Sequence, residues 1–216
     1  MISRNLLNRI ITSLLLFSLL ILIFYNKVLL VYTLIILGVF SILEFIRLIQ
    51  KIFKNKLKIF LICFMFIFFV FCFTFLFFFF SNFLQLKIIL FIILLSCVAS
   101  DIGGFIFGKL IGGRKLTRIS PNKTISGFVG SIVLTILVFT SMFIYLTNDL
   151  NYKYFLIAIV ISITCQTGDL FFSFLKRKAR IKDTGKILPG HGGVLDRLDG
   201  IFLGTTLGFL FFTLIF

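Results

Sequence analysis

The chain has 216 residues, of which 60% are hydrophobic and only 13% are charged, and its formal net charge is +15. A soluble domain usually carries about 25% charged residues. The composition therefore excludes a soluble globular domain, a disordered chain and a disulfide-rich scaffold. We expect an all-α fold, a polytopic bundle of transmembrane helices that forms a single integral-membrane domain over residues 1–216.

Seven apolar segments are predicted to span the membrane, since a bilayer core about 30 Å thick requires about 20 apolar residues per helix. They cover about 10–25, 28–45, 59–80, 87–107, 126–146, 154–174 and 200–216. The first two are short and are separated only by Asn26 and Lys27, which indicates a tight helical hairpin, with a tilted or re-entrant segment as the alternative. The third is uncharged and is expected to face lipid.

The positive charge is concentrated on one side of the predicted bundle. Nineteen of the 22 Lys and Arg residues lie before the first span or in the loops after the second, fourth and sixth spans. Lys27, Lys87 and Lys153 are the exceptions. Because Lys and Arg collect in cytoplasmic loops, we expect a cytoplasmic N-terminus. The expected location is a bacterial-type inner (cell) membrane. No cleavable signal peptide is expected, since a second apolar segment follows the first at once. The loop 46–58 is expected to fix topology and to contact anionic headgroups.

Two of the seven acids, Asp101 and Asp169, fall inside predicted spans. An intramembrane carboxylate costs about 2.5–3.5 kcal/mol to insert and is a functional-site hypothesis by default. Gln166, Asp169, Ser173 and Lys176 recur at intervals of three and four and therefore share one helical face. A helix–helix contact is the alternative interpretation of this polar stripe. The four cysteines lie inside spans and are expected to be small core residues, neither ligands nor disulfides.

Small residues recur every fourth position at the end of the fourth span. They are Ser100, Gly104, Gly108 and Gly112. Small residues at this spacing let two helices approach closely. We therefore expect this stripe to be a packing face, with Asp101 beside it.

The segment 173–200 is dense in polar and flexible residues. It holds seven cations, three carboxylates, the single histidine and five glycines. Backbone N–H groups, Lys and Arg suit phosphate oxygens. Carboxylates suit Mg²⁺, which often shares its coordination with substrate phosphates. The segment therefore predicts a site for a polyphosphate–metal complex at the membrane surface, and the loop 114–124 adds a second basic patch.

This segment resembles the signature of the phosphatidate cytidylyltransferases, the CDP-diacylglycerol synthases. The matching residues are Ser173, Lys176, Arg177, Lys182, Asp183, Gly185, His191, Gly192, Gly193, Asp196, Arg197 and Asp199. Residues 166–170 resemble the family's Q-x-G-D-L element, and residues 120–124 resemble its S-P-K-K-T element. Asn122 stands where the family has Lys, and Ser126 where it has Glu. Asp101 with the following glycines also resembles the family pattern.

The resemblance covers about residues 96–216. It implies that residues 91–216 form the catalytic helices and cytoplasmic loops, whereas residues 1–90 form N-terminal membrane helices. It also implies transfer of CMP from CTP to phosphatidate, giving CDP-diacylglycerol and pyrophosphate in phospholipid biosynthesis.

The resemblance further implies which residues act. Asp169 and Asp196 would hold Mg²⁺, with a second metal ion left open. The catalytic candidates are Asp169, Asp196, Lys176, Arg177, Asp183, Arg197 and Asp199. The substrate-binding candidates are Ser120, Lys123, Ser173, Lys182, His191, Gly192 and Gly193. A hydrogen bond from His191 to a phosphate or carboxylate is favoured over metal ligation.

The expected partners are CTP, phosphatidate and membrane lipids, without nucleic acid, and a homodimer is left open. Three alternatives stay open. The chain could be a related CTP-dependent transferase acting on another lipid phosphate or a prenyl alcohol. It could be a membrane transporter, although the acids cluster at one edge rather than at the midplane that transporters use. It could also be an inactive relative with a scaffolding role.

Overall fold

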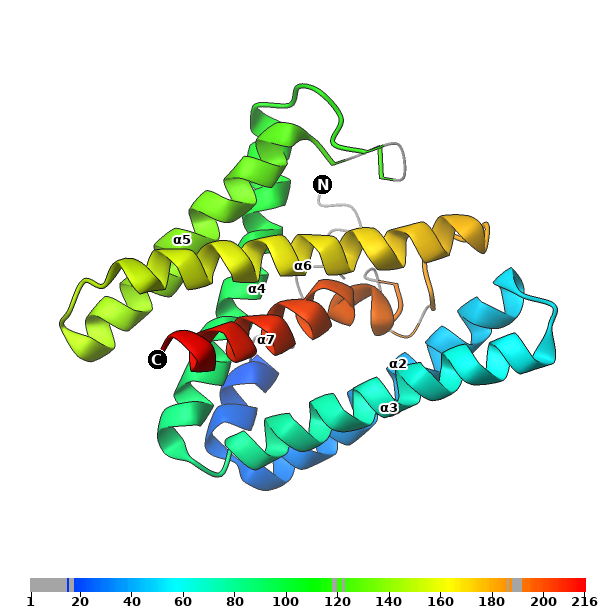
Figure 1. Ribbon diagram of the computed structural model, residues 1–216, viewed down its shortest axis with the longest axis horizontal. Helices are drawn as coiled ribbons and strands as arrows, with labels where there is room; N and C mark the ends of the chain where they lie inside the picture. Colours follow the sequence, from blue (N-terminus) through cyan, green and yellow to red (C-terminus); the bar gives the residue numbers. More distant parts are fainter. Residues whose placement is uncertain (1–14, 16–17, 118–119, 122, 186, 188–191) are drawn as a thin grey trace, which may run out of the picture. The chain divides into compact units, whose positions relative to one another are not determined.

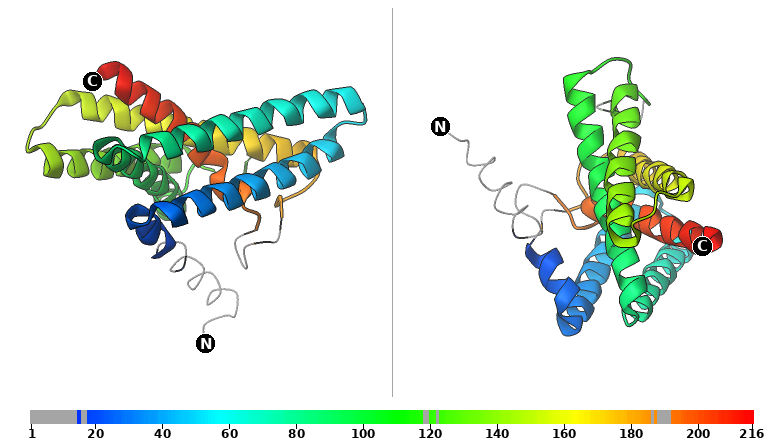
Figure 2. Two further views of the ribbon diagram at one scale, coloured as in Figure 1. Left: turned by 90° about the horizontal axis from the view of Figure 1, so that it is seen from below. Right: turned by 90° about the vertical axis from the view of Figure 1, so that its left-hand side faces the viewer.

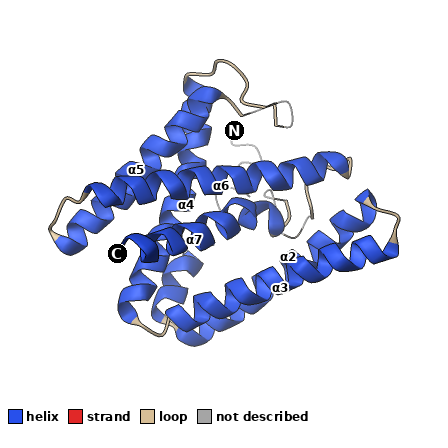
Figure 3. Ribbon diagram, viewed as in Figure 1, coloured by secondary structure: helices blue, strands red, loops and turns tan. Residues whose placement is uncertain are grey.

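The computed structural model describes residues 15, 18–117, 120–121, 123–185, 187 and 192–216. Within these residues the regular elements are helices, and no strand is formed (Figure 3). The helices are α2 (Lys27–Ile52), α3 (Lys56–Phe80), α4 (Leu84–Leu110), α5 (Ile125–Thr147), α6 (Tyr152–Lys178) and α7 (Leu195–Ile215), labelled in Figure 1. Residues 18–25 are also helical. The predicted all-α fold is confirmed.

The helix ends follow from side chains that satisfy the first backbone N–H groups. The Asn26 side chain accepts from the N–H groups of Val28 and Leu29 at 3.0 and 3.2 Å and starts α2. Thr124 caps α5 by accepting from Gly127 N at 3.1 Å. The Asn26 cap is the break predicted between the first two spans.

Six of the seven predicted spans are confirmed. All six labelled helices are long and apolar enough to cross a membrane, so the chain is an integral membrane protein. Residues 10–14 and 16–17 of the first predicted span lie outside the described residues, so this span is described only in part. The helix α3 has the highest hydropathy of the six, 3.0, and only 11% of its most apolar window is buried. It therefore has the exposed apolar surface expected of a helix that faces lipid.

The chain divides into two compact units. The first unit comprises residues 1–80 and 175–198, and the second comprises residues 81–174 and 199–216. The boundaries fall near the end of α6 and in the first turn of α7.

In the first unit, α2 and α3 form a hairpin of two neighbouring helices (Figure 2). The rings of Phe45 and Phe66 stack with centroids 3.9 Å apart. A methyl group placed on Gly38 would lie 3.3 Å from Val70. The missing side chain at position 38 therefore lets the two helices approach closely.

In the second unit, α4 and α5 pack through small residues, as the spacing predicted. A Cβ on Gly103 would lie 2.6 Å from the Gly130 carbonyl oxygen, and one on Gly104 would lie 2.8 Å from Ser131 Oγ. The Ser131 hydroxyl donates to the Ser100 carbonyl oxygen at 2.7 Å. Gly112 has a different role, because it follows α4 in a left-handed conformation with φ of 64°.

A second glycine stripe packs α7 within the same unit. Cβ atoms on Gly200 and Gly204 would lie 2.8 Å from Cys165 Sγ and 2.7 Å from Cys97 Sγ, respectively. A Cβ on Gly208 would lie 2.6 Å from Ile161 Cγ1. All four cysteines are free. Cys63, Cys97 and Cys165 are buried, which confirms them as small core residues, whereas Cys72 is half-buried.

Candidate functional site

The second unit presents a basic loop between α4 and α5 that folds back on itself. Leu116 N donates to the Lys123 carbonyl oxygen at 2.8 Å, and Ile125 N donates to that of Arg114 at 3.0 Å. An isolated antiparallel bridge joins Lys115 to Thr124. These bonds fix the backbone on both sides of the loop and hence the position from which Lys123 projects.

Lys123 projects onto Asp169 of α6. Its ammonium forms an ion pair with Asp169 Oδ2, and the Ser173 hydroxyl donates to Asp169 Oδ1 at 3.3 Å. The side chains of Lys123 and Asp169 are 25% and 30% exposed. Lys123, from a distant part of the sequence, and Ser173, one turn along α6, therefore meet at the partly open carboxylate of Asp169.

Ser126, which departs from the family pattern, stabilises the base of this loop. Its hydroxyl donates to the Gly112 carbonyl oxygen and lies 2.9 Å from Thr124 Oγ1. It thus joins the first turn of α5 to the turn after α4.

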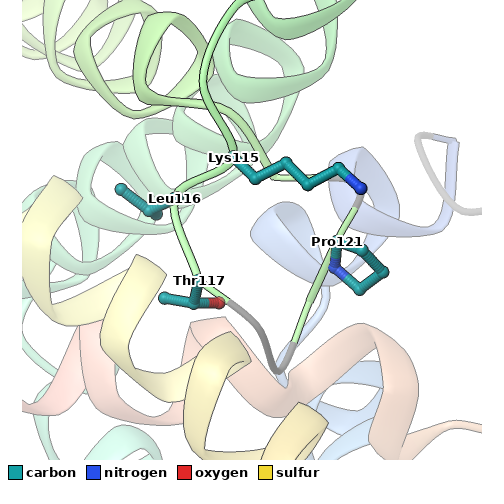
Figure 4. Close-up of a pocket in the computed structure, with 4 residues that line it drawn as sticks. All are labelled: Lys115, Leu116, Thr117 and Pro121. Atoms are coloured by element: carbon teal, nitrogen blue, oxygen red, sulfur yellow. The ribbon is translucent and has the colours of Figure 1, made fainter.

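The same loop encloses a surface hollow of about 380 Å³. Its lining residues are Lys115, Leu116, Thr117 and Pro121. In Figure 4, Lys115 extends across the loop towards Pro121, whereas Leu116 and Thr117 point to the other side. Ser120, a predicted substrate contact, is half-buried, and its N–H donates to Thr117 Oγ1 at 3.3 Å.

The polar stripe of α6 has two roles. At its apolar end Gln166 Nε2 donates to Ser162 Oγ at 3.1 Å, and Ser162 Oγ lies 3.1 Å from Ser100 Oγ of α4. This end is the helix–helix contact that was the alternative interpretation. Asp169 and Ser173 form the site end of the stripe.

In the first unit, α6 ends at the signature segment. Arg180 N donates to the Arg177 carbonyl oxygen and Ile181 N to that of Lys176, each at 3.0 Å. Arg180 is left-handed, with φ of 57°. This bonding pattern is a Schellman motif, which usually places glycine at the left-handed position.

Asp196 lies at the centre of the first unit's polar cluster. Lys176 Nζ donates to its Oδ1 at 2.8 Å. The N–H groups of Thr184 and Gly193 donate to its Oδ2 at 2.8 and 3.0 Å. The side chains of Lys176 and Asp196 are only 12% and 7% exposed. A carboxylate that accepts three donors in a nearly dry setting is held firmly in one orientation.

A second carboxylate in this cluster, Glu44 of α2, was not among the predicted site residues. Its side chain accepts from Thr184 Oγ1 at 2.7 Å, from Val194 N at 3.1 Å and from Leu195 N at 2.9 Å. Glu44 is 1% exposed. The signal available in the sequence was a lone acid within an otherwise apolar and basic region.

The glycines of the signature pack against these carboxylates. A Cβ on Gly185 or Gly193 would overlap the Glu44 carboxylate. A Cβ on Gly192 would lie 3.1 Å from Asp196 Oδ2 and 3.6 Å from Asp183 Cβ, and the φ of this glycine is 85°. The signature therefore needs glycine for close approach at two positions and for a left-handed conformation at the third.

The other predicted site residues differ in exposure. Arg177, Lys182, Asp183 and Arg197 are exposed. Asp199, in the second unit, is 7% exposed, and its Oδ1 accepts from Gly200 N at 2.9 Å. His191 lies outside the described residues.

A second hollow, of about 400 Å³, lies within the first unit between α2 and the segment that follows α6. Its lining residues are Arg47, Leu48, Gln50, Lys51, Ile181 and Thr184. Arg47 and Lys51, which belong to the segment 46–58 predicted to fix topology, lie in α2 and border the signature segment at this hollow.

The predicted metal ligands belong to different units, Asp169 to the second and Asp196 to the first. Among the described residues, no cluster of three or more His, Cys, Asp or Glu side chains gathers as a metal site. Both residues supply carboxylate oxygens beside a lysine ammonium. Such donors fit Mg²⁺, which is often held by one or two carboxylates together with substrate phosphates. Their assignment as ligands stays a prediction.

Comparison with known proteins gives a consistent family. A model described as the cytidylyltransferase family matches residues 2–215. The chain is 47% identical over 102 residues to a phosphatidate cytidylyltransferase of Staphylococcus haemolyticus, covering 46% of this chain and 39% of the relative. It is 41% identical over 128 residues to one of Mycobacterium leprae, covering 58% and 40%. It is 43% identical over 118 residues to one of Bacillus subtilis, covering 54% and 43%. The matched segments thus span about two fifths of these relatives' lengths.

Proposed function

Since the chain belongs to the cytidylyltransferase family, we propose that it is a phosphatidate cytidylyltransferase. It would transfer CMP from CTP to phosphatidate and release CDP-diacylglycerol and pyrophosphate. The observation that carries this proposal is that each predicted metal-binding carboxylate lies beside a lysine, Asp169 beside Lys123 and Asp196 beside Lys176.

The reaction requires charge neutralisation more than base catalysis. An anionic oxygen of the lipid phosphate attacks the α-phosphorus of CTP, a new P–O bond forms, and the bond to the β-phosphate bridging oxygen breaks. The nucleophile is already ionised, so no strong base is needed. The barrier comes from bringing two anions together, which cations placed at the site lower.

The cations of the described segments suit this task. Lys123 and Lys176 are held in place by their carboxylate partners, which limits the side-chain entropy lost when they also bind phosphate oxygens. Arg177, Lys182 and Arg197 are exposed and would contact the triphosphate or the lipid phosphate. The Gly192 and Gly193 backbone would border the phosphates.

We propose that Asp169 and Asp196 are the Mg²⁺ ligands. The metal would supply Lewis-acid stabilisation of the phosphate charge that develops in the transition state. A second metal ion would be held in the same way, and Asp183, which borders Gly192 together with Asp196, is the candidate to help.

We further propose that the protein lies in the inner (cell) membrane with this site facing the cytoplasm. The basic loops support this orientation through the bias of Lys and Arg towards the cytoplasmic side, where CTP is available. A homodimer stays a prediction, and the mass of the purified protein in detergent tests it.

The test is a label-transfer assay on purified protein with Mg²⁺ and CTP labelled in either the α- or the γ-phosphate. With phosphatidate, the α-label should enter the lipid and the γ-label should leave as pyrophosphate. Transfer of the γ-label to a prenyl alcohol would instead identify a CTP-dependent kinase. Transfer of the α-label to a different lipid phosphate, with phosphatidate inert, would overturn the substrate assignment.

A further inference from the structure

We propose that Glu44 of α2 is a positioning residue for the nucleotidyl transfer, holding the signature segment so that Asp196 is correctly oriented. This inference rests on the proposed function. It assigns a role to the N-terminal part of the chain, where the sequence predicted only membrane helices and topology signals.

In the first unit, the same two chain segments, at Thr184 and at residues 193–195, supply hydrogen-bond donors to two carboxylates. Glu44 accepts from the Thr184 hydroxyl and from Val194 N and Leu195 N. Asp196 accepts from Thr184 N and from Gly193 N. Thr184 thus bonds to one carboxylate through its side chain and to the other through its backbone.

The geometry makes the position of Asp196 depend on Glu44. The N–H groups of Val194 and Leu195 point to Glu44, and Asp196 is the next residue along the chain. These N–H groups lie at the start of α7, where the helix itself provides no acceptor. A carboxylate there is further favoured by the helix dipole. Glu44 therefore fixes the two chain segments whose backbone N–H groups donate to Asp196, whereas the third donor, Lys176, comes from the end of α6.

The surroundings of Glu44 admit little else. Gly185 and Gly193 lie so close to the Glu44 carboxylate that a Cβ on either glycine would overlap it. Thr184 Oγ1 lies against the same carboxylate. The Glu44 side chain is 1% exposed, so its three hydrogen bonds, from Thr184, Val194 and Leu195, replace the water that burial excludes. A glutamine side chain has one acceptor oxygen and one NH₂ donor. In either flip, its NH₂ would face an N–H or hydroxyl that now donates to Glu44.

The first arm of the test is hydrogen exchange at residue resolution, which needs no activity. Glu44→Gln should speed amide exchange at least tenfold at Val194 and Leu195, which contact Glu44. It should also do so at Thr184 and Gly193, whose N–H groups contact Asp196. Unchanged exchange at the second pair would reduce Glu44 to a local helix cap and overturn the proposal.

Two further variants control for general destabilisation. Phe45→Leu changes the next buried residue of α2, whose ring packs on Phe66, and should leave exchange at Thr184 and Gly193 unchanged. Thr184→Val removes one hydroxyl bond to Glu44 but retains the N–H that donates to Asp196. Thr184→Val should accelerate exchange at position 184 less than Glu44→Gln does. It replaces Glu44→Gln as the test variant if Glu44→Gln does not fold.

The second arm is the transfer assay. Glu44→Gln should lower kcat at least tenfold and raise the Mg²⁺ concentration for half-maximal rate, with KM for CTP changed less than threefold. Phe45→Leu should change none of these by more than twofold. Wild-type kcat and Mg²⁺ dependence in Glu44→Gln would overturn the positioning role. If the wild-type protein transfers nothing, the proposed function fails, and the exchange arm still decides whether Glu44 orders the donors of Asp196.

Discussion

The bond between Thr184 and Glu44 offers a measurable test of the first unit's polar cluster. Replacing Thr184 with Val keeps the side-chain shape but removes the hydroxyl that donates to Glu44 Oε2 at 2.7 Å. Hydrogen bonds to charged groups contribute about 1.5–3 kcal/mol. For a domain of this size, a loss of 1 kcal/mol lowers the melting temperature by about 2–4 °C. Thr184→Val should therefore lower the melting temperature by about 3–12 °C.

The free cysteines supply the assay. Cys63, Cys97 and Cys165 are buried and Cys72 is half-buried, so the fluorescence of a thiol-reactive dye should rise above the Cys72 signal as the protein unfolds in detergent. The matched control is Thr184→Ser, which retains the hydroxyl and should keep most of the wild-type melting temperature.

Two results would refute this reasoning. One is a wild-type melting temperature in Thr184→Val, since the hydroxyl bond would then contribute nothing. The other is an equal loss in Thr184→Ser and Thr184→Val, since keeping the hydroxyl would then make no difference to stability.

Three further predictions concern the ion pair, the helix packing and the end of α6. Lys123→Met should lower transfer activity at least tenfold, because its ammonium pairs with Asp169, whereas Lys115→Met, in the same loop, should lower it less than threefold; equal losses would contradict the assignment. Gly130→Val should cost about 2 kcal/mol or more in thermal unfolding, because even a Cβ at this position would overlap the Phe107 side chain, and unchanged unfolding would refute the close packing. Arg180→Gly should raise the melting temperature by about 2–8 °C by relieving about 1–2 kcal/mol of left-handed strain, and a lower melting temperature would show that the Arg180 side chain outweighs this strain.

The helices and one half of the site could be predicted because each depends on a local pattern. The apolar runs predict the spans and their approximate ends, including the break at Asn26. The spacing of Asp169 and Ser173 placed both on one face of α6, and the structure joins them by a hydrogen bond. The Gly104–Gly108 repeat indicated the close packing of α4 and α5 in the same way.

The role of Glu44 could not be predicted, because it depends on a contact across 140 residues of sequence. Nothing in the local pattern of α2 distinguishes an acid that ends a span from one that binds a distant loop. From the sequence, Gly193 is only a substrate-binding candidate and Gly185 only a residue that matches the signature. The structure shows that they also admit this carboxylate.

Ser126 was a departure whose consequence the sequence did not give. Its hydroxyl bonds to the Gly112 carbonyl oxygen and lies beside Thr124, a tertiary arrangement that depends on how the chain turns after α4. A serine at this position stabilises the loop that carries Lys123.

The central claim is that this chain transfers CMP to phosphatidate through Asp169 and Asp196. Its most direct test is the rate at which purified wild-type, Asp169→Asn and Asp196→Asn proteins form CDP-diacylglycerol from CTP, phosphatidate and Mg²⁺. We expect wild-type turnover with equal amounts of pyrophosphate, and at least a hundredfold loss in each variant when it is assayed well below its own melting temperature. No product from the wild-type protein, or wild-type rates in both variants, would contradict the account.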